Sequence, residues 1–349
     1  MRPTTKDLAK AAGVSLATVD RVLNERPGVR RKTIDAVTEA IERIGFVRNL
    51  SAANLARGRV YNFEFLLPKT GGEYLSEVEA HIAEAEAALA TDGVVVRHRR
   101  VLDRNPHAIA RILSGVNPSE VSGVALMAAE TPEVRDAVMR LSERGVSVVR
   151  FGSSLGDESA ADFVGSDNRA AGATAGRLMG RFIGAAPGKV LIIAETMNNL
   201  DSVERRNGFD GVLGAFHPNL TALPTLETHG DPERARATIK RSFENHQELC
   251  GVYIMSAEAA DALHAICAYS EPTRQVVIAH ERTPTTVAKL IDGSLDAIIA
   301  QDPGHLVRSA IRMLKVRCDD RQPLLSQEKI RIEILIRENL ASAPPGAAV

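Results

Sequence analysis

Short apolar runs that alternate with helical patterns constrain the fold of this chain from Tyr61 onward. The expected strands are NFEFLLP, VVVRHRRV, GVALMA, VSVVRF, KVLIIAE, GVYIMS, QVVIAH, LDAIIA and KIRIEILIR. The helix after the first run should bury one face, formed by Leu75, Val78, Ile82, Ala85 and Leu89. Strands separated by helices predict parallel sheets covered by helices on both faces. About 280 residues of this pattern exceed one usual core, so we expect an α/β body of two lobes.

The first part of the chain has a different pattern, with a Gly-Val-Ser break between two short helical stretches. Thr4 and Asp7 predict a capping box, and Gly13 should end the first helix. Ser15 should cap a second helix that runs to Asn24. The expected inward residues are Leu8, Ala11, Ala12, Val19, Val22 and Leu23, followed by Ile34, Val37, Ile41 and Ile44 of a third helix over 33–44. These patterns predict an all-α helix-turn-helix head.

The head is basic and the body is acidic. Residues 1–59 contain 12 Lys and Arg against 6 Asp and Glu, whereas the remainder contains 31 against 38. This asymmetry is expected where only the head meets a polyanion. The outward face of the second helix suits the major groove of double-stranded DNA, where Arg21 can bind a guanine edge. The candidate DNA-contacting residues here are Thr4, Ser15, Leu16, Ala17, Thr18, Asp20, Arg21 and Asn24. The alternative is the surface of a protein-interaction module.

Neither membrane insertion nor export is indicated. The segment MRPTTKDLAKAAG lacks the apolar core of a signal peptide, and no apolar run approaches the ~18 residues of a membrane span. We therefore expect a cytoplasmic protein with no membrane partner. Cys250, Cys267 and Cys318 are widely spaced and odd in number, which predicts buried thiols rather than disulfides or a zinc site.

Sequence motifs for catalysis are incomplete. GAAPGKV resembles a phosphate-binding loop, but Ile183 stands five positions before Gly188 and Val190 follows Lys189, so the G-x-x-x-x-G-K-[ST] pattern fails. No G-x-G-x-x-G follows the first strand. We therefore expect no enzymatic activity, no catalytic residues, no metal and no cofactor.

Three stretches of the head, GVSLATVDRVLN, KTIDAVTEAIERIGFVRN and SAANLARG, resemble the lactose-repressor (LacI/GalR) family of bacterial transcription regulators. In that family a hinge helix follows the three-helix module, pairs with its twin in the dimer and inserts a leucine into the minor groove. Leu55 matches that leucine. The eight or so residues of 50–57 are too few for a stable isolated helix, so the hinge should fold only on DNA. The alternative is that Leu55 packs in an interdomain linker.

Four stretches of the body, FVGSDNRAAGATAGRLMGRFIG, ERRNGFDGVL, VVIAHERTPTT and DAIIAQDPGHLVRSAIRML, resemble the effector-binding part of the same family. The resemblance implies the fold of periplasmic sugar-binding proteins, with crossings between lobes expected near 160, 302 and 325 and a small ligand between the lobes. The expected domains are 1–48 (helix-turn-helix), 49–60 (hinge), 61–340 (effector binding and dimerisation) and 341–349 (flexible tail). Lobe 1 should contain about 61–160 and 303–325, and lobe 2 about 161–302 and 326–340.

By position, the resemblance assigns six residues to the ligand cleft: Tyr74, Ser153, Arg205, Ser256, Glu281 and Gln301. It implies that Arg205 donates to ligand hydroxyls and that Glu281 accepts from them, while Tyr74 could offer a stacking face. The guanidinium donors suit vicinal diols or a carboxylate. Alternatively, Arg205 and Glu281 pair with each other. Asp167 and Asp302 are expected to cap helices, and His280 should be a satisfied cleft or core side chain rather than a metal ligand.

The resemblance therefore implies a homodimeric transcription regulator that binds a pseudo-palindromic DNA operator. A small polar effector, a sugar or polyol, should control operator affinity. Most members of that family are repressors, so the resemblance favours repression. Two rival classes remain open at this stage. One is a solute-binding protein without DNA function, and the other is a sugar-modifying α/β enzyme.

Overall fold

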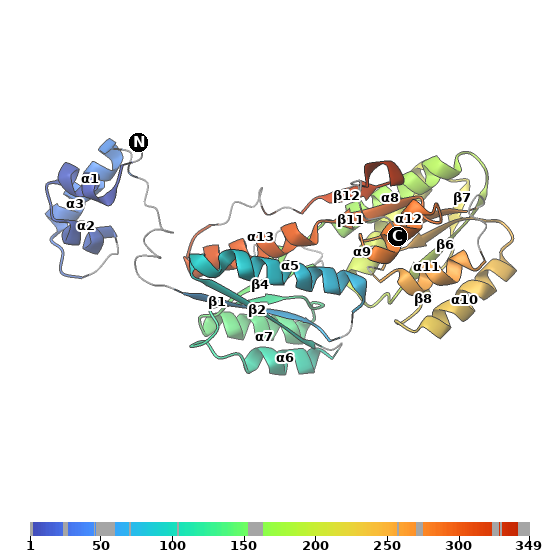
Figure 1. Cartoon of the computed structure of the whole chain (residues 1–349), viewed down its shortest axis with the longest axis horizontal. Helices are drawn as coiled ribbons and strands as arrows, with labels where there is room; N and C mark the ends of the chain where they lie inside the picture. Colours follow the sequence, from blue (N-terminus) through green and yellow to red (C-terminus); the bar gives the residue numbers. More distant parts are fainter. Residues whose placement is uncertain are drawn as a thin grey trace, which may run out of the picture. The chain divides into compact units, whose positions relative to one another are not determined.

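The computed structural model describes residues 3–23, 27–44, 46, 60–69, 71–102, 105–152, 163–256, 258–269, 275–322, 328 and 330–340. The chain divides into two compact units, Met1–Arg59 and Val60–Val349. The first unit is helical and the second contains two sheets flanked by helices (Figure 1).

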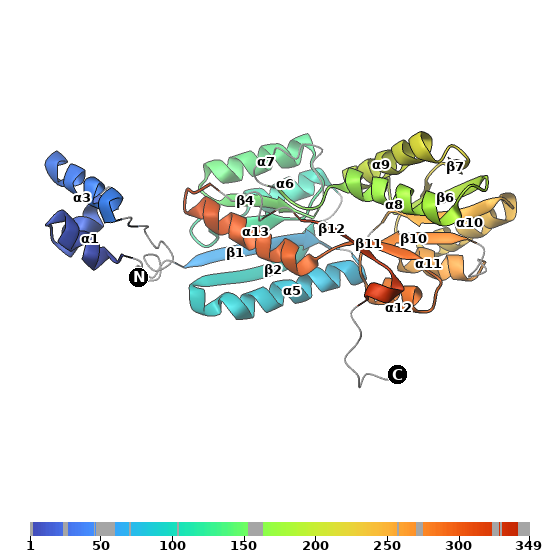
Figure 2. The same cartoon turned by 90° about the horizontal axis from the view of Figure 1, so that it is seen from above.

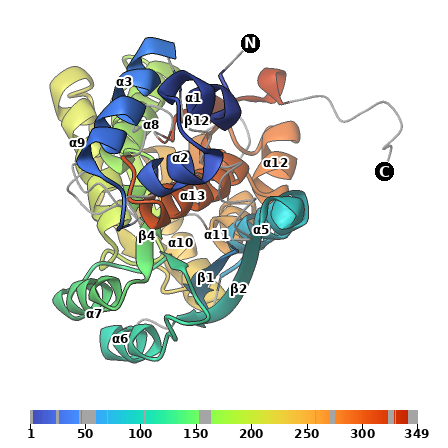
Figure 3. The ribbon, with the colours of Figure 1, turned by 90° about the vertical axis from the view of Figure 1, so that its left-hand side faces the viewer.

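The head contains three helices, α1 (Thr5–Ala12), α2 (Leu16–Leu23) and α3 (Arg31–Ile44), which pack together (Figure 3). Their shared core is formed by Leu8, Ala9, Val19, Val37, Ala40 and Phe46, with Ala11, Ala12, Val14, Val22, Leu23, Ile41 and Ile44 partly buried against it. The predicted inward stripes are therefore confirmed with one exception. Ile34 is 37% exposed, because it lies in the first turn of α3, away from this cluster.

The Gly-Val-Ser break forms the corner between α1 and α2, as predicted. Thr4 and Asp7 form a capping box at the start of α1. Gly13 adopts a left-handed conformation with φ of 65°, and its N–H donates to carbonyls in the last turn of α1. A residue with a side chain would be strained there, which explains why glycine ends this helix. Ser15 Oγ then accepts from the N–H of Thr18, 3.1 Å away, and so caps α2.

The first lobe of the body contains a five-stranded parallel sheet in the order β2-β1-β3-β4-β5. Its strands are β1 (Tyr61–Pro68), β2 (Val94–Leu102), β3 (Gly123–Leu126), β4 (Ser147–Phe151) and β5 (Phe163–Val164). One face is covered by α5 (Glu73–Leu89) and α13 (Pro303–Cys318), and the other by α6 (Pro106–Ser114) and α7 (Pro132–Glu143) (Figure 1). The short helix η1 (Ala90–Asp92) follows α5.

The second lobe contains a seven-stranded sheet whose main order is β12-β11-β10-β9-β6-β7. Its strands are β6 (Gly188–Ala194), β7 (Leu220–Ala222), β8 (Leu226–Glu227), β9 (Leu249–Ile254), β10 (Val276–His280), β11 (Ala297–Gln301) and β12 (Ile332–Leu335). β8 pairs with β6, and only β12 runs antiparallel to its neighbour, β11. The parallel, helix-covered sheets confirm the predicted fold class.

Helices cover both faces of this second sheet. On one face α8 (Asn168–Ile183) and α9 (Leu200–Phe216) lie side by side (Figure 2). On the other face lie α10 (Pro232–Asn245), α11 (Ala260–Cys267) and α12 (Pro284–Ile291). The short helix η2 (Arg337–Asn339) follows β12.

The chain passes three times between the two lobes. β5 still pairs with β4 in the first sheet, so the first crossing lies after Val164 rather than near 160. The second lies between Gln301 and α13, where it was expected. The third crossing lies between Ile330 and Ile332 rather than near 325, because Ile330 packs in the core of the first lobe and Ile332 packs against that of the second. β12 is consequently shorter than the alternating isoleucines suggested, and Ile334 is 42% exposed.

The three cysteines are free thiols and half-buried, so the prediction of buried thiols is wrong. Cys267 and Cys318 are the last residues of α11 and α13, and Cys250 is the second residue of β9. Within the described ranges, no group of three or more His, Cys, Asp or Glu side chains could hold a metal ion. No helix in the described part of the chain is long and apolar enough to cross a bilayer.

Candidate effector site and DNA-contacting face

Four of the residues expected in the ligand cleft meet at the carboxyl ends of strands in the second sheet. Arg205 Nη2 lies 3.4 Å from Glu281 Oε1. Gln301 Nε2 donates to the same Glu281 oxygen over 3.3 Å and to the hydroxyl of Tyr74 over 2.9 Å. Arg205, Glu281 and Gln301 are at most 4% exposed. The carboxyl edge of a parallel sheet is where open α/β folds bind ligands.

Arg205 is held in this position by a close approach of α8 and α9. A Cβ atom on Gly172 of α8 would lie 1.9 Å from the carbonyl oxygen of Arg205, so only glycine fits there. This contact brings Arg205 Nε within 2.8 Å of Asn168 Oδ1. Nη1 donates to the carbonyl of Met255, at the end of β9, over 2.6 Å. The guanidinium is therefore fixed by three separate elements.

Glu281 has an unusual backbone conformation that aims its carboxylate into the cluster. Its φ of 64° is uncommon for a residue other than glycine and occurs often at functional sites. Thr286 Oγ1 donates to the Glu281 carbonyl over 2.8 Å, and the Gln301 N–H donates to Glu281 Oε2 over 3.3 Å. Burial raises the pKa of Glu281, although Arg205 and Gln301 act in the opposite direction.

Two buried polar atoms beside this pair have no hydrogen-bond partner among the described residues. They are the Nδ2 donor of Asn168 and the Oε1 acceptor of Gln301. Asn168 is 1% exposed and Gln301 4% exposed. Buried polar groups are normally satisfied, so such an orphaned donor and acceptor call for an explanation. A ligand hydroxyl can both accept and donate, and would satisfy groups of this kind.

His280, the last residue of β10, is a satisfied core side chain, as expected. Its Nε2 lies 2.7 Å from the hydroxyl of Tyr253, whose ring stacks on Phe209 at 4.6 Å between centroids. Burial, and to a lesser extent the charge of Arg205, lowers the pKa of His280 well below its ordinary value. His280 is therefore neutral at physiological pH and adds no charge to the site.

The expected roles of Tyr74, Ser256 and Ser153 have different outcomes. Tyr74 is 8% exposed and therefore offers no open stacking face, and its hydroxyl accepts a hydrogen bond from Gln301 Nε2. Burial, followed by the charge of Glu281, raises the pKa of Tyr74. Ser256 Oγ accepts from the N–H of Glu195. Ser153 lies outside the described residues. Asp167 and Asp302 cap α8 and α13, as predicted.

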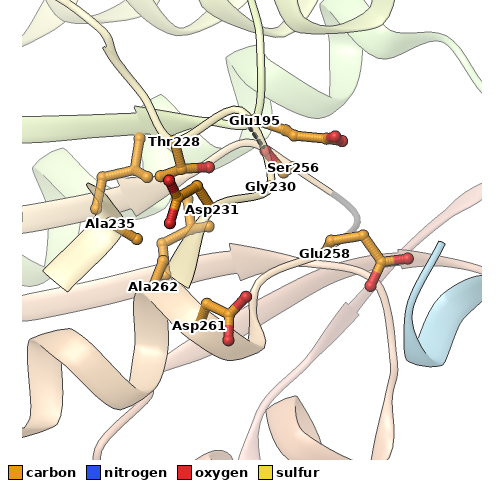
Figure 4. A pocket seen from close by; sticks show the side chains of 11 residues that line it. Glu195, Thr228, Gly230, Asp231, Ala235, Ser256, Glu258, Asp261 and Ala262 are labelled. Carbon is orange, nitrogen blue, oxygen red and sulfur yellow. Dashed lines mark hydrogen bonds between the residues drawn. The ribbon is translucent and has the colours of Figure 1, made fainter. Parts of the chain in front are cut away.

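A small cavity lies at the carboxyl ends of β6, β8 and β9, on the face of the second sheet that α10 and α11 cover (Figure 4). Several carboxylates line it, together with Ser256 and Thr228: Glu195, Asp231, Glu258 and Asp261. Asp231 accepts two N–H groups at the start of α10 and is therefore a helix cap. Sequence reasoning missed Asn168 and Glu258. Asn168 directly follows the expected helix cap Asp167, and Glu258 lies two residues beyond the predicted strand GVYIMS, so position could have indicated both residues but not their roles.

The outward face of α2 is exposed, as a DNA-contacting face requires. Leu16 is 47% exposed, and Ala17, Asp20 and Arg21 are exposed as well. Thr18 Oγ1 lies 2.8 Å from Ser15 Oγ, so these two hydroxyls, like that of Thr4, take part in helix capping. The candidate contacts Asn24 and Leu55 lie outside the described residues.

Comparison with known families agrees with both units. The family of bacterial regulatory proteins described as lacI family matches residues 4–49, and the periplasmic binding protein domain matches residues 63–321. The chain belongs to the lacI family of DNA-binding transcriptional regulators. Its body is a periplasmic-binding-protein domain.

This lacI-family chain is 28% identical to the HTH-type transcriptional regulator AglR of Rhizobium meliloti over 268 residues, 74% of this chain and 72% of the relative. Its body also resembles solved solute-binding proteins of ABC transporters. One, from Burkholderia graminis in complex with D-arabinose, has a TM-score of 0.72 at 20% identity and covers 82% of this chain and 98% of its own. Another, from Agrobacterium vitis bound with alpha-D-tagatopyranose, has a TM-score of 0.69 at 19% identity and covers 81% of this chain and 96% of its own. These two likenesses establish the fold of the body.

Proposed function

We propose that this lacI-family regulator is a homodimeric repressor whose operator affinity is controlled by a sugar or polyol bound at Arg205, Glu281 and Gln301. The observation that carries the proposal is the orphaned pair of Asn168 Nδ2 and Gln301 Oε1 beside the buried ion pair. The donors and acceptors together fit a ligand that carries several hydroxyl groups.

The charge balance of the site favours a neutral ligand. Arg205 and Glu281 compensate each other and are nearly fully buried, so a ligand with an unpaired charge would upset a pair that is already desolvated. A sugar or polyol can instead exchange hydrogen bonds with both partners. Solute-binding proteins of this fold from Burkholderia graminis and Agrobacterium vitis are solved with D-arabinose and alpha-D-tagatopyranose, which agrees with this class of ligand.

Control of DNA binding would follow from linkage between the two units. The effector can change operator affinity only by as much as its own affinity differs between the DNA-bound and free arrangements of the lobes. In the proposed arrangement, residues 1–48 bind a pseudo-palindromic operator as a dimer, 49–60 form the hinge, and 61–340 bind the effector and the second copy. Leu55 would enter the minor groove and kink the duplex.

The effector site is tested by replacing the orphaned donor of Asn168 with a carboxylate oxygen, a change that also adds a negative charge beside Arg205. Asn168→Asp keeps the oxygen that holds Arg205 but removes the Nδ2 donor. Isothermal titration of the full chain with sugars, polyols and sugar phosphates should give saturable binding for at least one of them. That binding should weaken about tenfold in Asn168→Asp, the effect of one lost hydrogen bond of about 1.4 kcal/mol.

Asn245→Asp serves as the matched control. Asn245 is exposed at the end of α10, at the opposite edge of the second sheet from the candidate site. Equal weakening in both variants, or no saturable binding of any tested compound, would contradict the proposed effector site. A gel-shift experiment tests DNA binding separately. The full chain should retard selected DNA, and removal of residues 1–60 should abolish that retardation. If the full chain itself does not retard the DNA, the protein is a solute-binding protein without DNA function.

A further inference from the structure

Three successive residues at the start of α5 each form a hydrogen bond with a different segment of the other lobe. The N–H of Gly72 donates to Glu258 Oε1 over 2.7 Å, after β9. Glu73 accepts from Thr285, in the first turn of α12 after β10. The Tyr74 hydroxyl accepts from Gln301, the last residue of β11. Residues 72–74 therefore span the carboxyl ends of three adjacent strands.

The lobes exchange helix caps at this contact. Gly72 is the N-cap of α5 and lacks a side chain of its own to cap it, and Glu258 of the second lobe accepts its N–H instead. Figure 4 shows Glu258 pointing toward this helix. In return, Glu73 of the first lobe accepts the N–H of Thr285 over 3.0 Å and its hydroxyl over 2.7 Å, at the N-terminus of α12. Carboxylates are favourable at both helix N-termini.

The same three residues are connected to the candidate effector site by two routes. Along the first, Gln301 Nε2 bridges the carboxylate of Glu281 and the hydroxyl of Tyr74. Along the second, Thr286 holds the carbonyl of Glu281, and its chain neighbour Thr285 binds Glu73. A movement of Glu281 would therefore change the hydrogen bonds of two adjacent residues of α5, Glu73 and Tyr74.

We propose that residues 72–74 form a clasp that holds the two lobes closed before any effector binds, with Glu73 as its main positioning residue. Glu73 does not touch the effector. It fixes the first turn of α12, which in turn supports the left-handed conformation of Glu281. A role of the clasp in regulation rests on the proposed effector site. The presence of the clasp in the ligand-free chain does not depend on that site.

Hydrogen exchange of the ligand-free full chain tests the clasp directly, because the amides of Gly72 and Thr285 are its donors. In Glu73→Gln, exchange should become about 10- to 100-fold faster at Thr285 and also at Gly72, which Glu73 does not bind, since loss of a charge-assisted bond opens the whole contact. Thr285→Val, which removes the hydroxyl only, should accelerate exchange at Gly72 in the same direction.

Glu77→Gln is the matched control. Glu77 lies one turn further along α5 and forms no hydrogen bond to the second lobe in the described part of the chain, so both amides should exchange as in the unaltered protein. If Glu73→Gln accelerates Thr285 alone, the contacts are independent caps and the clasp does not exist. If neither amide changes, Glu73 does not hold the lobes together. Failure of sugar binding would leave this result untouched and would contradict only the proposed function.

Discussion

Arg205 and Glu281 form an ion pair with 3.4 Å between Nη2 and Oε1, and the two side chains are 5% and 2% exposed. They come from different elements, α9 and the loop after β10. Each charge is desolvated and compensated mainly by the other. Loss of either member would therefore leave an uncompensated buried charge in the candidate effector site.

Removing one member of this pair should destabilise the body strongly. Arg205→Met leaves the Glu281 carboxylate buried without its cation and should lower the free energy of unfolding by about 3 to 5 kcal/mol. Urea denaturation of the full chain measures this change. Arg236→Met breaks the exposed pair with Glu233 and should cost less than about 1 kcal/mol. Similar costs for the two variants would show that burial does not strengthen the constraint on Arg205.

The close contact of α8 and α9 gives a second prediction. Gly172→Ala should lower the free energy of unfolding by about 3 kcal/mol or more and weaken sugar binding, because the new methyl group displaces the backbone of Arg205. Gly214→Ala, on α9, meets nothing within 4 Å and should be neutral or stabilise by about 0.5 to 1 kcal/mol. Thermal unfolding and calorimetric titration measure both effects. A neutral Gly172→Ala would mean that the helices are not in close contact.

The two carboxylates of the clasp should respond to pH in opposite directions. Burial raises the pKa of Glu258, and the nearby charges of Glu195 and Glu73 add to this, so ionisation of Glu258 disfavours the folded state as pH rises. Burial would also raise the pKa of Glu73, but hydrogen bonds from Thr285 and Thr283 outweigh it and lower the pKa. The stabilisation by Glu73 is therefore present above its ordinary value of 4.5 and is lost as pH falls.

Urea midpoints measured from mildly acidic to neutral pH test this contrast. Relative to the unaltered chain, Glu258→Gln should gain stability as pH rises, because it removes the ionisation penalty. Glu73→Gln should lose stability at neutral pH, and the loss should shrink toward low pH. Arg100 also lies near Glu258, and His264 near Glu73, so both should be kept unchanged. Parallel pH profiles for the two variants would contradict these assignments.

Arg21 on the exposed face of α2 should distinguish the operator from random DNA. Arg21→Ala should reduce the difference in binding free energy between operator and random DNA by about 1 to 3 kcal/mol, with a smaller effect on binding to random DNA itself. Arg31, which is exposed at the start of α3 and pairs with Asp35, provides a control that should affect both kinds of DNA alike. Fluorescence anisotropy with a selected operator and a scrambled duplex measures the ratio. An unchanged ratio in Arg21→Ala would remove this residue from base recognition.

Much of the architecture was predictable from local patterns in the sequence. Capping residues such as Thr4, the left-handed Gly13 and the apolar spacing of α5 each act within a few residues, so sequence spacing alone indicates them. The exposure of Ile34 depends on how the three helices of the head pack together, and that information is not local. The late third crossing depended likewise on which core receives Ile330.

The candidate site was predictable as a set of residues but not as a network. Position by position, the resemblance assigned Arg205, Glu281 and Gln301, and the structure brings them together. It could not indicate the role of Asn168, because that role arises from the glycine-mediated approach of α8 and α9. Nor could it indicate the exchange of caps through Glu73, since the partner lies more than two hundred residues away in the chain.

Operator affinity measured with and without effector tests the central claim most directly. Fluorescence anisotropy of the full chain on its selected operator should show a change of about 5- to 150-fold when the bound sugar or polyol is saturating, corresponding to a coupling of about 1 to 3 kcal/mol. The same compound, at concentrations that saturate the unaltered chain, should have a much smaller effect on Asn168→Asp. Identical binding curves with and without a compound that demonstrably saturates the body would contradict the account.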